Sequence, residues 1–212
     1  SKNPKNLFVI EKDKRLITQL SQKFKEKIKL YNEDILKFSY QSIDNKKLII
    51  YGNLPYNIST QILVSWIRLD NLNNFCKKFI LLFQKEVADR IIAEQNSKDY
   101  GRLSILTSWK MSVKKIIDIE PENFRPSPKV KSSLLTFEPR AEYLNLKSIN
   151  LEHVTNIFFN QRRKMIKKPL NILFKNFDEV AKQLELDLNL RPQNLPKETF
   201  FKICELYEKL IN

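Results

Sequence analysis

Three polar side chains, Glu11, Asp34 and Asn53, follow short apolar runs of the kind that form buried strands. The runs span residues 7–10, 28–31 and 47–51. In open α/β sheets ligands lie outside the carboxyl ends of the strands, so these positions should share one edge. There, carboxylates could accept hydrogen bonds from ribose hydroxyls and from an adenine amino group. For Glu11 alone, a solvated acid at a helix start is an equally good interpretation, but the three positions together favour a nucleoside site.

The rest of the chain must supply the sheet that positions these side chains. Its first two thirds alternate apolar runs with helical patterns, as in β-α units around a largely parallel sheet. We expect helices after Asp13 and over 59–69, 87–94 and 101–109, and further strands over 79–83, 113–119 and 132–137. The last two strands flank a proline-rich segment and should form an antiparallel pair at one sheet edge. From about Asn150 apolar residues recur only at helical spacing, which predicts a small all-helical domain.

The predicted sheet lacks its first strand, which is central in this architecture. A glycine-rich turn should lie roughly 20 residues before the ribose-binding acid. Only ten residues precede Glu11, however, and the two glycines, Gly52 and Gly101, stand alone. Removing a central strand would leave unpaired backbone groups on both neighbours. We therefore expect the chain to be a fragment of a longer polypeptide, with an N-terminally incomplete Rossmann-like domain over 1–140 and a helical domain over 148–212.

Composition narrows the class of protein. The 212 residues include 38 Lys and Arg against 24 Asp and Glu, a formal net charge of +14. This favours an anionic partner, nucleic acid first and an acidic membrane surface second, although a lysine excess is also typical of AT-rich codon usage. No run approaches the roughly 18–20 apolar residues of a membrane span, and no signal-peptide pattern opens the chain. We expect a soluble, cytoplasmic monomer that does not bind membranes. Cys76 and Cys204 are isolated, which predicts buried free thiols and no metal site.

Several blocks of sequence are shared with a known family. The stretch NLPYNIST at 53–60 resembles the fourth motif of the rRNA adenine N6,N6-dimethyltransferases. Other blocks resemble the bacterial small-subunit (16S) members, in the family's order and over essentially the whole chain. These blocks are VIEKD at 9–13, QKEV at 84–87 with Arg90, NSKDYGRLS at 96–104, FRPSPKV at 124–130 and FNQRRK at 159–164. An NPPY-type tetrapeptide alone is shared by DNA, RNA and protein methylases, so the ordered set carries the resemblance.

The resemblance implies a fold and a cofactor. The fold would be α/β, a Rossmann-like class I methyltransferase sheet whose first strand is absent from this chain, plus a small all-helical C-terminal domain. The cofactor would be S-adenosyl-L-methionine (SAM), bound by Glu11, Asp34 and Asn53.

The resemblance also implies catalytic roles for residues of two loops. The Asn53 side-chain oxygen and a carbonyl of the Leu54-Pro55 segment would accept both N–H bonds of an adenine amine and direct its lone pair at the methyl group. This is positioning and electrostatic preorganisation, without a strong general base. Proline has no N–H and a fixed φ, which helps to hold the neighbouring carbonyls in place. Tyr56 and Phe124 would stack on opposite faces of a flipped-out base. The alternatives are a core aromatic at Tyr56 and a loop anchor at Phe124.

Basic residues are the candidates for RNA contact. Residues 161–168 carry five basic side chains and no acid, and we expect them to be helical. Such a helix alone is more often a solvated face; the resemblance implies contact with ribosomal RNA. The candidates are Lys98, Arg102, Lys129, Lys131, Arg162, Arg163 and Lys164. Arg102 could instead pair with Glu86 or Asp89.

The implied activity is SAM-dependent dimethylation of the N6 amines of two adjacent adenosines near the 3′ end of 16S rRNA during ribosome assembly. One alternative is the related large-subunit (23S) enzyme that confers macrolide resistance, which the 96–104 and 159–164 blocks disfavour. A second is a non-catalytic RNA-binding assembly factor, suggested by the absent glycine-rich turn. Retention of Glu11, Asp34, Asn53 and Tyr56 argues against it.

Overall fold

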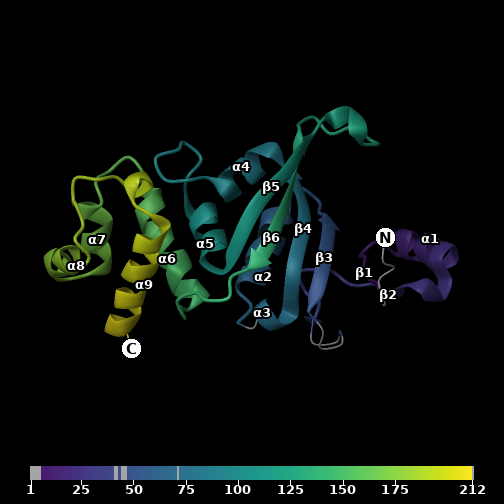
Figure 1. Ribbon diagram of the computed structural model, residues 1–212, viewed down its shortest axis with the longest axis horizontal. Helices are drawn as coiled ribbons and strands as arrows, with labels where there is room; N and C mark the ends of the chain where they lie inside the picture. Colours follow the sequence, from purple (N-terminus) through teal and green to yellow (C-terminus); the bar gives the residue numbers. More distant parts are fainter. Residues whose placement is uncertain (1–5, 41–42, 44–46, 71, 212) are drawn as a thin grey trace. The chain divides into compact units, whose positions relative to one another are not determined.

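The computed structural model describes residues 6–40, 43, 47–70 and 72–211 (Figure 1). Contacts divide the chain into two compact units, Ser1–Asn45 and Lys46–Asn212. The division separates Glu11 and Asp34 from Asn53, and each unit is described by itself.

The first unit is a single β-α-β element. Strand β1 (Phe8–Ile10) pairs in parallel with β2 (Lys29–Tyr31), and helix α1 (Lys14–Phe24) with the 3₁₀ turn η1 (Lys25–Lys27) connects them. Asp13 caps α1, because its carboxylate accepts a hydrogen bond from the Arg15 backbone N–H at 2.8 Å. The predicted strands and the helix after Asp13 are confirmed.

The second unit is built on a four-stranded sheet of order β3-β4-β6-β5 (Figure 1). Its strands are β3 (Leu48–Asn53), β4 (Cys76–Gln84), β5 (Met111–Ile119) and β6 (Ser132–Pro139). Strands β3 and β4 are parallel, β6 is antiparallel to β4, and β5 pairs antiparallel with β6 at the sheet edge. The predicted antiparallel edge pair is confirmed. The β5–β6 connection, which includes the 3₁₀ turn η3 (Pro121–Asn123), extends beyond the sheet from the end where β4 finishes.

Helices cover this sheet, and their apolar side chains pack with those of the strands to form the core. They are α2 (Ser59–Ile67), α3 (Leu72–Phe75), α4 (Lys85–Ile92) and α5 (Arg102–Lys110). Trp66 of α2 stacks on Phe79 of β4 with ring centroids 4.8 Å apart, and both are almost completely buried. Cys76 and Cys204 are buried free thiols as predicted, and burial raises the pKa of each to about 12.

The last third of the chain is helical, as predicted, and the described residues after Pro139 contain no strand. The elements are α6 (Ser148–Asn160), α7 (Lys167–Leu173), α8 (Phe177–Gln183), the 3₁₀ turn η4 (Pro192–Asn194) and α9 (Lys197–Ile211). Arg68, after α2, forms a two-point ion pair with Glu152 of α6, with N–O distances of 2.7 and 2.8 Å. Contacts place these helices in one unit with the sheet. The separate domain over 148–212 stays a prediction.

One expected element is wrong. The basic segment 161–168 is not one helix, because α6 ends at Asn160 and α7 begins at Lys167. The backbone turns between them: the N–H of Lys164 donates to Gln161 O at 2.8 Å, and the N–H of Ile166 donates to Leu190 O at 2.8 Å. Tertiary bonding therefore overrides the helical propensity of the Arg and Lys residues.

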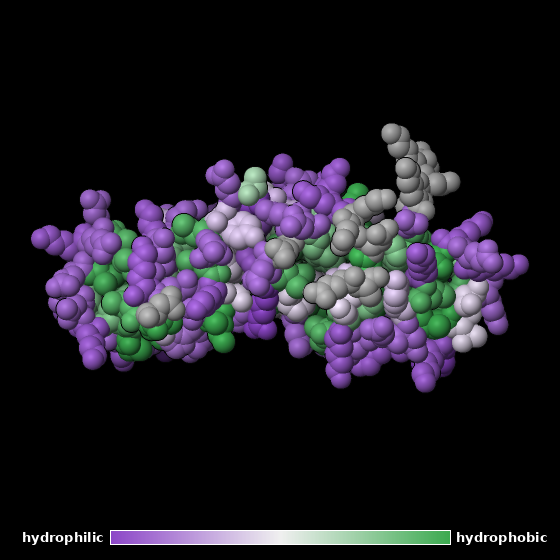
Figure 2. Space-filling model, turned by 90° about the horizontal axis from the view of Figure 1, so that it is seen from below, coloured by the Kyte–Doolittle hydropathy of each residue, from purple (hydrophilic) through white to green (hydrophobic). Residues whose placement is uncertain are grey.

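The helices of the described residues are too short or too polar to cross a membrane. Figure 2 shows hydrophilic side chains over most of the visible face, with apolar patches between them.

Candidate functional site

The Asn-Leu-Pro-Tyr segment forms a tight turn at the carboxyl end of β3. Asn53 is the last residue of β3, pairs in register with Leu82 of β4 and has an exposed side chain. The Pro55 carbonyl accepts a hydrogen bond from the Ile58 N–H at 3.1 Å, so the turn uses this carbonyl; the Leu54 carbonyl is not part of that bond. Asn53 thus presents an amide at the strand end, next to a backbone that the turn holds in place.

The Tyr56 ring is fixed by a bond to a different strand. Its hydroxyl lies 2.6 Å from the Ser132 hydroxyl, the first residue of β6. Ser132 is completely buried and Tyr56 is half-buried, so one ring end is anchored while part of the ring stays accessible. The Tyr56 carbonyl also accepts from the Ser59 hydroxyl at 3.1 Å, which ties the turn to the first residue of α2. The turn therefore holds an aromatic ring beside the root of the β5–β6 connection.

Gly52 is needed for close packing under this turn. A Cβ atom at position 52 would lie 2.9 Å from methyl groups of both Leu54 and Leu81. Contacts that short would displace one of these side chains. The glycine therefore lets Leu54 fold back against the sheet while Asn53 stays exposed.

A cavity of about 640 Å³ lies where β4 ends and the β5–β6 connection begins. Three of the predicted RNA-binding residues, Lys98, Lys129 and Lys131, line it. The cavity is nevertheless not basic: the lining has four lysines, with Lys85, against five carboxylates, namely Glu86, Asp89, Asp99, Glu120 and Glu122. Lys131 pairs with Glu120 at 2.7 Å, and Lys85 pairs with Asp89 at 2.6 Å. Within the described residues, no His, Cys, Asp and Glu cluster of three or more could hold a metal ion.

Phe124 lies on the β5–β6 connection, directly after η3, and is half-buried. Its N–H donates to the Pro121 carbonyl at 3.1 Å, and the Ser127 hydroxyl donates to the same carbonyl at 2.9 Å. The loop is therefore internally braced around Phe124. Arg102, the first residue of α5, is exposed and has no ion pair among the described residues, while its suggested partner Asp89 pairs with Lys85.

In the first unit, Glu11 and Asp34 lie beyond the carboxyl ends of β1 and β2. One Glu11 oxygen accepts the Asp13 N–H at 2.8 Å. Asp34 accepts the Lys12 ammonium at 2.8 Å through one oxygen and the Leu36 N–H at 3.1 Å through the other. The Lys12 hydrogen bond lowers the pKa of Asp34, which keeps this carboxyl ionised and able to accept hydrogen bonds. Both carboxylates suit polar hydroxyl or amino groups of a ligand.

Arg162 is committed to protein acceptors. Its guanidinium donates to the Gln193 side-chain oxygen at 3.0 Å and to the carbonyls of Ser97 and Lys98. Its neighbours Arg163 and Lys164 are exposed and have no carboxylate partner among the described residues. The basic turn thus contains one structural arginine followed by two cations that solvent can reach.

Comparisons with known proteins identify the family of this chain. The family model described as "Ribosomal RNA adenine dimethylase" matches residues 1–209. The chain belongs to the ribosomal RNA adenine dimethylase family. A relative named "Ribosomal RNA small subunit methyltransferase A", from Pelagibacter ubique (strain HTCC1062), is 54% identical over 210 residues, which cover 99% of this chain and 80% of the relative.

Solved structures show the fold of this dimethylase family member. A dimethyladenosine transferase from Plasmodium falciparum matches with a TM-score of 0.79 and 22% identity, over 97% of this chain and 82% of that one. The 23S rRNA methyltransferase ErmE matches with a TM-score of 0.67 and 20% identity, over 96% of this chain and 82% of that one. The chain therefore has an α/β methyltransferase fold, as predicted.

Two features of this dimethylase were not found from the sequence. The tether between Tyr56 and Ser132 joins residues 76 positions apart. The bonds of Arg162 reach the 96–104 block, 64 and 65 positions away. The only signal in the sequence was that the two partners of each contact lie in or beside blocks shared with the family.

Proposed function

We propose that this protein transfers methyl groups from S-adenosyl-L-methionine to the N6 amines of two adjacent adenosines near the 3′ end of small-subunit 16S rRNA. The observation that carries the proposal is the Asn-Leu-Pro-Tyr turn at the end of β3. It holds an exposed amide and an anchored aromatic ring in a chain of the dimethylase family. The 54% identical relative, by its name, acts on the small subunit, which favours 16S over 23S rRNA.

The turn would position the target amine. The Asn53 side-chain oxygen accepts one amine N–H, and the Leu54 carbonyl accepts the other, since the Pro55 carbonyl already accepts the Ile58 N–H. Two accepted hydrogen bonds draw the nitrogen towards a tetrahedral form and free its lone pair from the purine ring. When bound, the cofactor supplies an electrophilic methyl group on a sulfonium centre. The protein's part is orientation, and the amine proton can leave to water.

Aromatic side chains would hold the extruded base. Tyr56 offers a ring face that the Ser132 hydroxyl fixes, and Phe124 offers a second ring from the braced β5–β6 connection. Stacking contributes roughly 1–3 kcal/mol per base, which offsets much of the few kcal/mol needed to unstack it.

Cofactor contacts would come from three acceptors. Glu11 has a carboxylate oxygen outside its bond to the Asp13 N–H, which suits ribose hydroxyls. Asp34 is held ionised by Lys12 and suits the adenine amino group. Asn53 would contact the cofactor near the methyl group that is transferred.

Exposed Lys and Arg side chains, some in loops and some in helices, would contact the RNA. Lys98, Lys129 and Arg102 carry no ion pair among the described residues, nor do Arg163 and Lys164. Lys131 and Arg162 have protein partners, so their contribution to RNA affinity should be smaller.

Methylation of purified ribosomal particles tests the function. Small and large subunits that lack these methyl groups are incubated with the protein and methyl-labelled cofactor, and the labelled nucleotides are identified. We expect N6,N6-dimethyladenosine in small-subunit RNA, and abolished transfer with nearly unchanged RNA affinity in Asn53→Ala. Label in large-subunit RNA alone would refute the 16S proposal, and full turnover by Asn53→Ala would refute the amine-orienting role. Calorimetric titration with the cofactor, carried out on this chain and on a version extended upstream, separates an enzyme from a non-catalytic assembly factor. Absence of binding to the extended version would favour the assembly factor.

A further inference from the structure

Lys110, the last residue of α5, is a buried cation to which the proposed function gives no role. Its exposed fraction is 3%. The ammonium donates to the Leu69 carbonyl at 3.0 Å, and it lies 4.3 Å from the Trp109 ring centroid and 5.4 Å from that of Tyr143. Burial lowers the pKa of this ammonium, and the charge of Asp70 opposes that shift. Burial of a cation is costly, and the contacts of Lys110 show which parts of the chain it joins.

These contacts join three segments of the chain. Leu69 follows the end of α2, and Trp109 belongs to α5. Tyr143 belongs to residues 140–147, here called the linker, through which the chain passes from β6 to α6 (Figure 1). Lys110 therefore connects two helices that cover the sheet with the segment that leads into the helical region.

Hydrogen bonds hold the linker at the end of α5. The Trp109 ring N–H donates to the Leu144 carbonyl at 2.8 Å. The Arg140 backbone N–H donates to the Lys110 carbonyl, and the Arg140 side chain donates to the Ser108 carbonyl, both at 2.8 Å. The linker is thus fixed to α5 at both ends of the 140–144 stretch, and the Lys110 ammonium adds the contact that includes the end of α2.

Helix α2 extends from the Asn-Leu-Pro-Tyr turn to this joint. At its start, the Ser59 hydroxyl donates to the Tyr56 carbonyl at 3.1 Å. Its other end is held by Lys110 and by the ion pair between Arg68 and Glu152 of α6. A packed helix moves as a rigid element, so the position of the turn is coupled to the position of the linker and of α6.

We propose that Lys110 is a positioning residue for methyl transfer: it clamps the end of α2 to the linker and so holds the helical region at a fixed position relative to the Asn-Leu-Pro-Tyr turn. The proposal rests on the proposed function, because it takes methyl transfer to a ribosomal particle as the reaction. A particle that contacts both regions presents its adenosine to the turn correctly only if their spacing is constant. A displacement of about 1 Å at a reacting group can lower the rate about a hundredfold.

Lys110→Met tests the clamp, because methionine keeps a long apolar side chain but cannot donate to the Leu69 carbonyl. Double electron–electron resonance between spin labels on Lys114→Cys of β5 and Lys182→Cys of α8 measures the position of the helical region. Both labelled residues are exposed, whereas the two native thiols are buried and should not take the label. We expect a narrow distance distribution with Lys110 present and a wider one in Lys110→Met. Lys110→Arg, which keeps a cationic donor, should retain the narrow distribution.

Kinetics on small subunits that lack the methyl groups provide the second readout, with the form of the protein that binds the cofactor in calorimetry. Lys110→Met should lower kcat about tenfold and keep KM within about twofold, because the RNA contacts of each region remain while their spacing varies. Glu152→Gln, which weakens the ion pair with Arg68 at the same end of α2, should also lower kcat. Lys77→Met is the matched control, because Lys77 is exposed on β4 and lies outside the joint. Melting temperatures show that each variant is folded.

An unchanged distance distribution in Lys110→Met would overturn the clamp. A wider distribution with wild-type kcat would overturn its importance for the reaction, and a rise in KM alone would indicate lost RNA affinity instead of lost positioning. Equal effects of Lys110→Met and Lys77→Met would also contradict the proposal. If the wild-type protein methylates no particle, the proposed function fails, whereas the distance measurement still decides whether Lys110 holds the helical region in place.

Discussion

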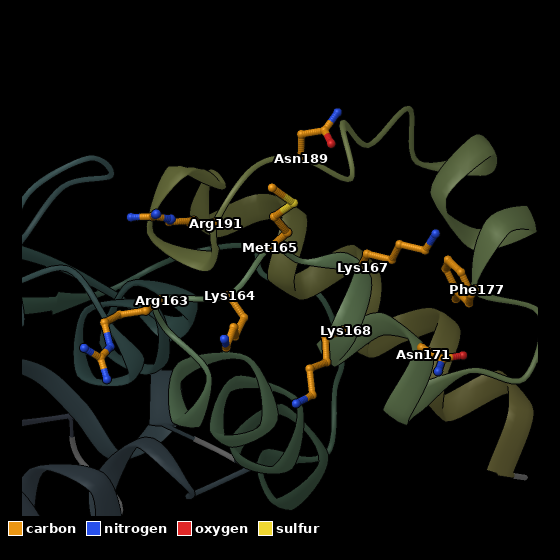
Figure 3. A pocket seen from close by; sticks show the side chains of 9 residues that line it. All are labelled: Arg163, Lys164, Met165, Lys167, Lys168, Asn171, Phe177, Asn189 and Arg191. Atoms are coloured by element: carbon orange, nitrogen blue, oxygen red, sulfur yellow. The ribbon is translucent and has the colours of Figure 1, made fainter.

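Arg162 and Arg163 are adjacent arginines for which the structure predicts opposite phenotypes. The Arg162 guanidinium bonds to Gln193, Ser97 and Lys98. The Arg163 side chain is exposed and lines a cavity of about 650 Å³, called here the basic cavity, whose charged lining residues are Arg163, Lys164, Lys167, Lys168 and Arg191 (Figure 3). Arg162→Ala should therefore lower stability and leave the salt dependence of RNA binding nearly unchanged. Arg163→Ala should do the reverse.

The size of the stability loss follows from the bonds removed. Three hydrogen bonds from one charged group, each contributing about 1–1.5 kcal/mol, sum to about 3 kcal/mol once the exposure of the freed acceptors to water is allowed for. For a chain of this length, each kcal/mol lowers the melting temperature by about 2–4 °C, so Arg162→Ala should lose roughly 6–12 °C. Arg162→Lys should recover little, because an ammonium cannot reproduce the planar fork of donors. Arg163→Ala should change the melting temperature by less than about 2 °C.

Two measurements separate the roles of the arginines. Thermal unfolding followed by circular dichroism gives the stability change, and anisotropy titrations at several salt concentrations give the slope for an RNA ligand. The reasoning is refuted if Arg162→Ala melts like wild type, or if it flattens the salt slope as much as Arg163→Ala does.

Three further predictions concern the turn and the buried thiols. Gly52→Ala should lower methyl transfer at least about tenfold and destabilise the fold by about 1–3 kcal/mol, because its Cβ would lie 2.9 Å from two leucine methyls. Gly101→Ala is the control: its Cβ would lie 3.7 Å from the nearest neighbour atom, so methyl transfer and unfolding free energy should both stay close to the wild-type values. Tyr56→Phe and Ser132→Ala should each destabilise, with a coupling of about 1 kcal/mol in a double-mutant cycle of unfolding free energies; additive effects would show that the 2.6 Å contact contributes nothing. Burial raises the pKa of Cys76 from 9.0 to about 12, so the native thiol should resist alkylation at pH 9 and react after unfolding, as mass spectrometry can measure. Because the unfolded thiol ionises first, the stability that this shift contributes should be lost as the pH rises above 9.

Hydrophobic periodicity was sufficient to predict most elements of the fold. Strand β4, for example, buries Phe79, Leu81, Leu82 and Phe83, and this apolar run identified the strand within a few residues at each end. The edge pair β5–β6 was predictable because a proline-rich segment separates two short apolar runs. Such patterns report how much of each segment is buried, which local sequence largely determines.

Local sequence could not reveal bonds between distant segments. Arg and Lys are good helix formers, so the basic segment after Asn160 favoured a helix; the turn results from the Ile166 bond to Leu190 and from the guanidinium of Arg162. The same limit applies to charge. Lys129 and Lys131 suggested a basic rim, but Glu120 and the α4 acids line the same cavity and offset them.

Arg162 also fixes the spacing between the two cavities. The Arg162 guanidinium donates to the carbonyl of Lys98, and Lys98 lines the cavity at the end of β4. Arg163, which follows Arg162 in the chain, lines the basic cavity. The Asn96 N–H donates to Gln193 O at 2.8 Å and strengthens the same connection. RNA bound by the cations of the basic cavity would thus be kept at a set distance from the β4 edge. Arg162→Ala should therefore lower kcat/KM on intact small subunits while oligonucleotide affinity at the basic cavity stays at the wild-type value; a parallel loss of both would contradict this spacing role.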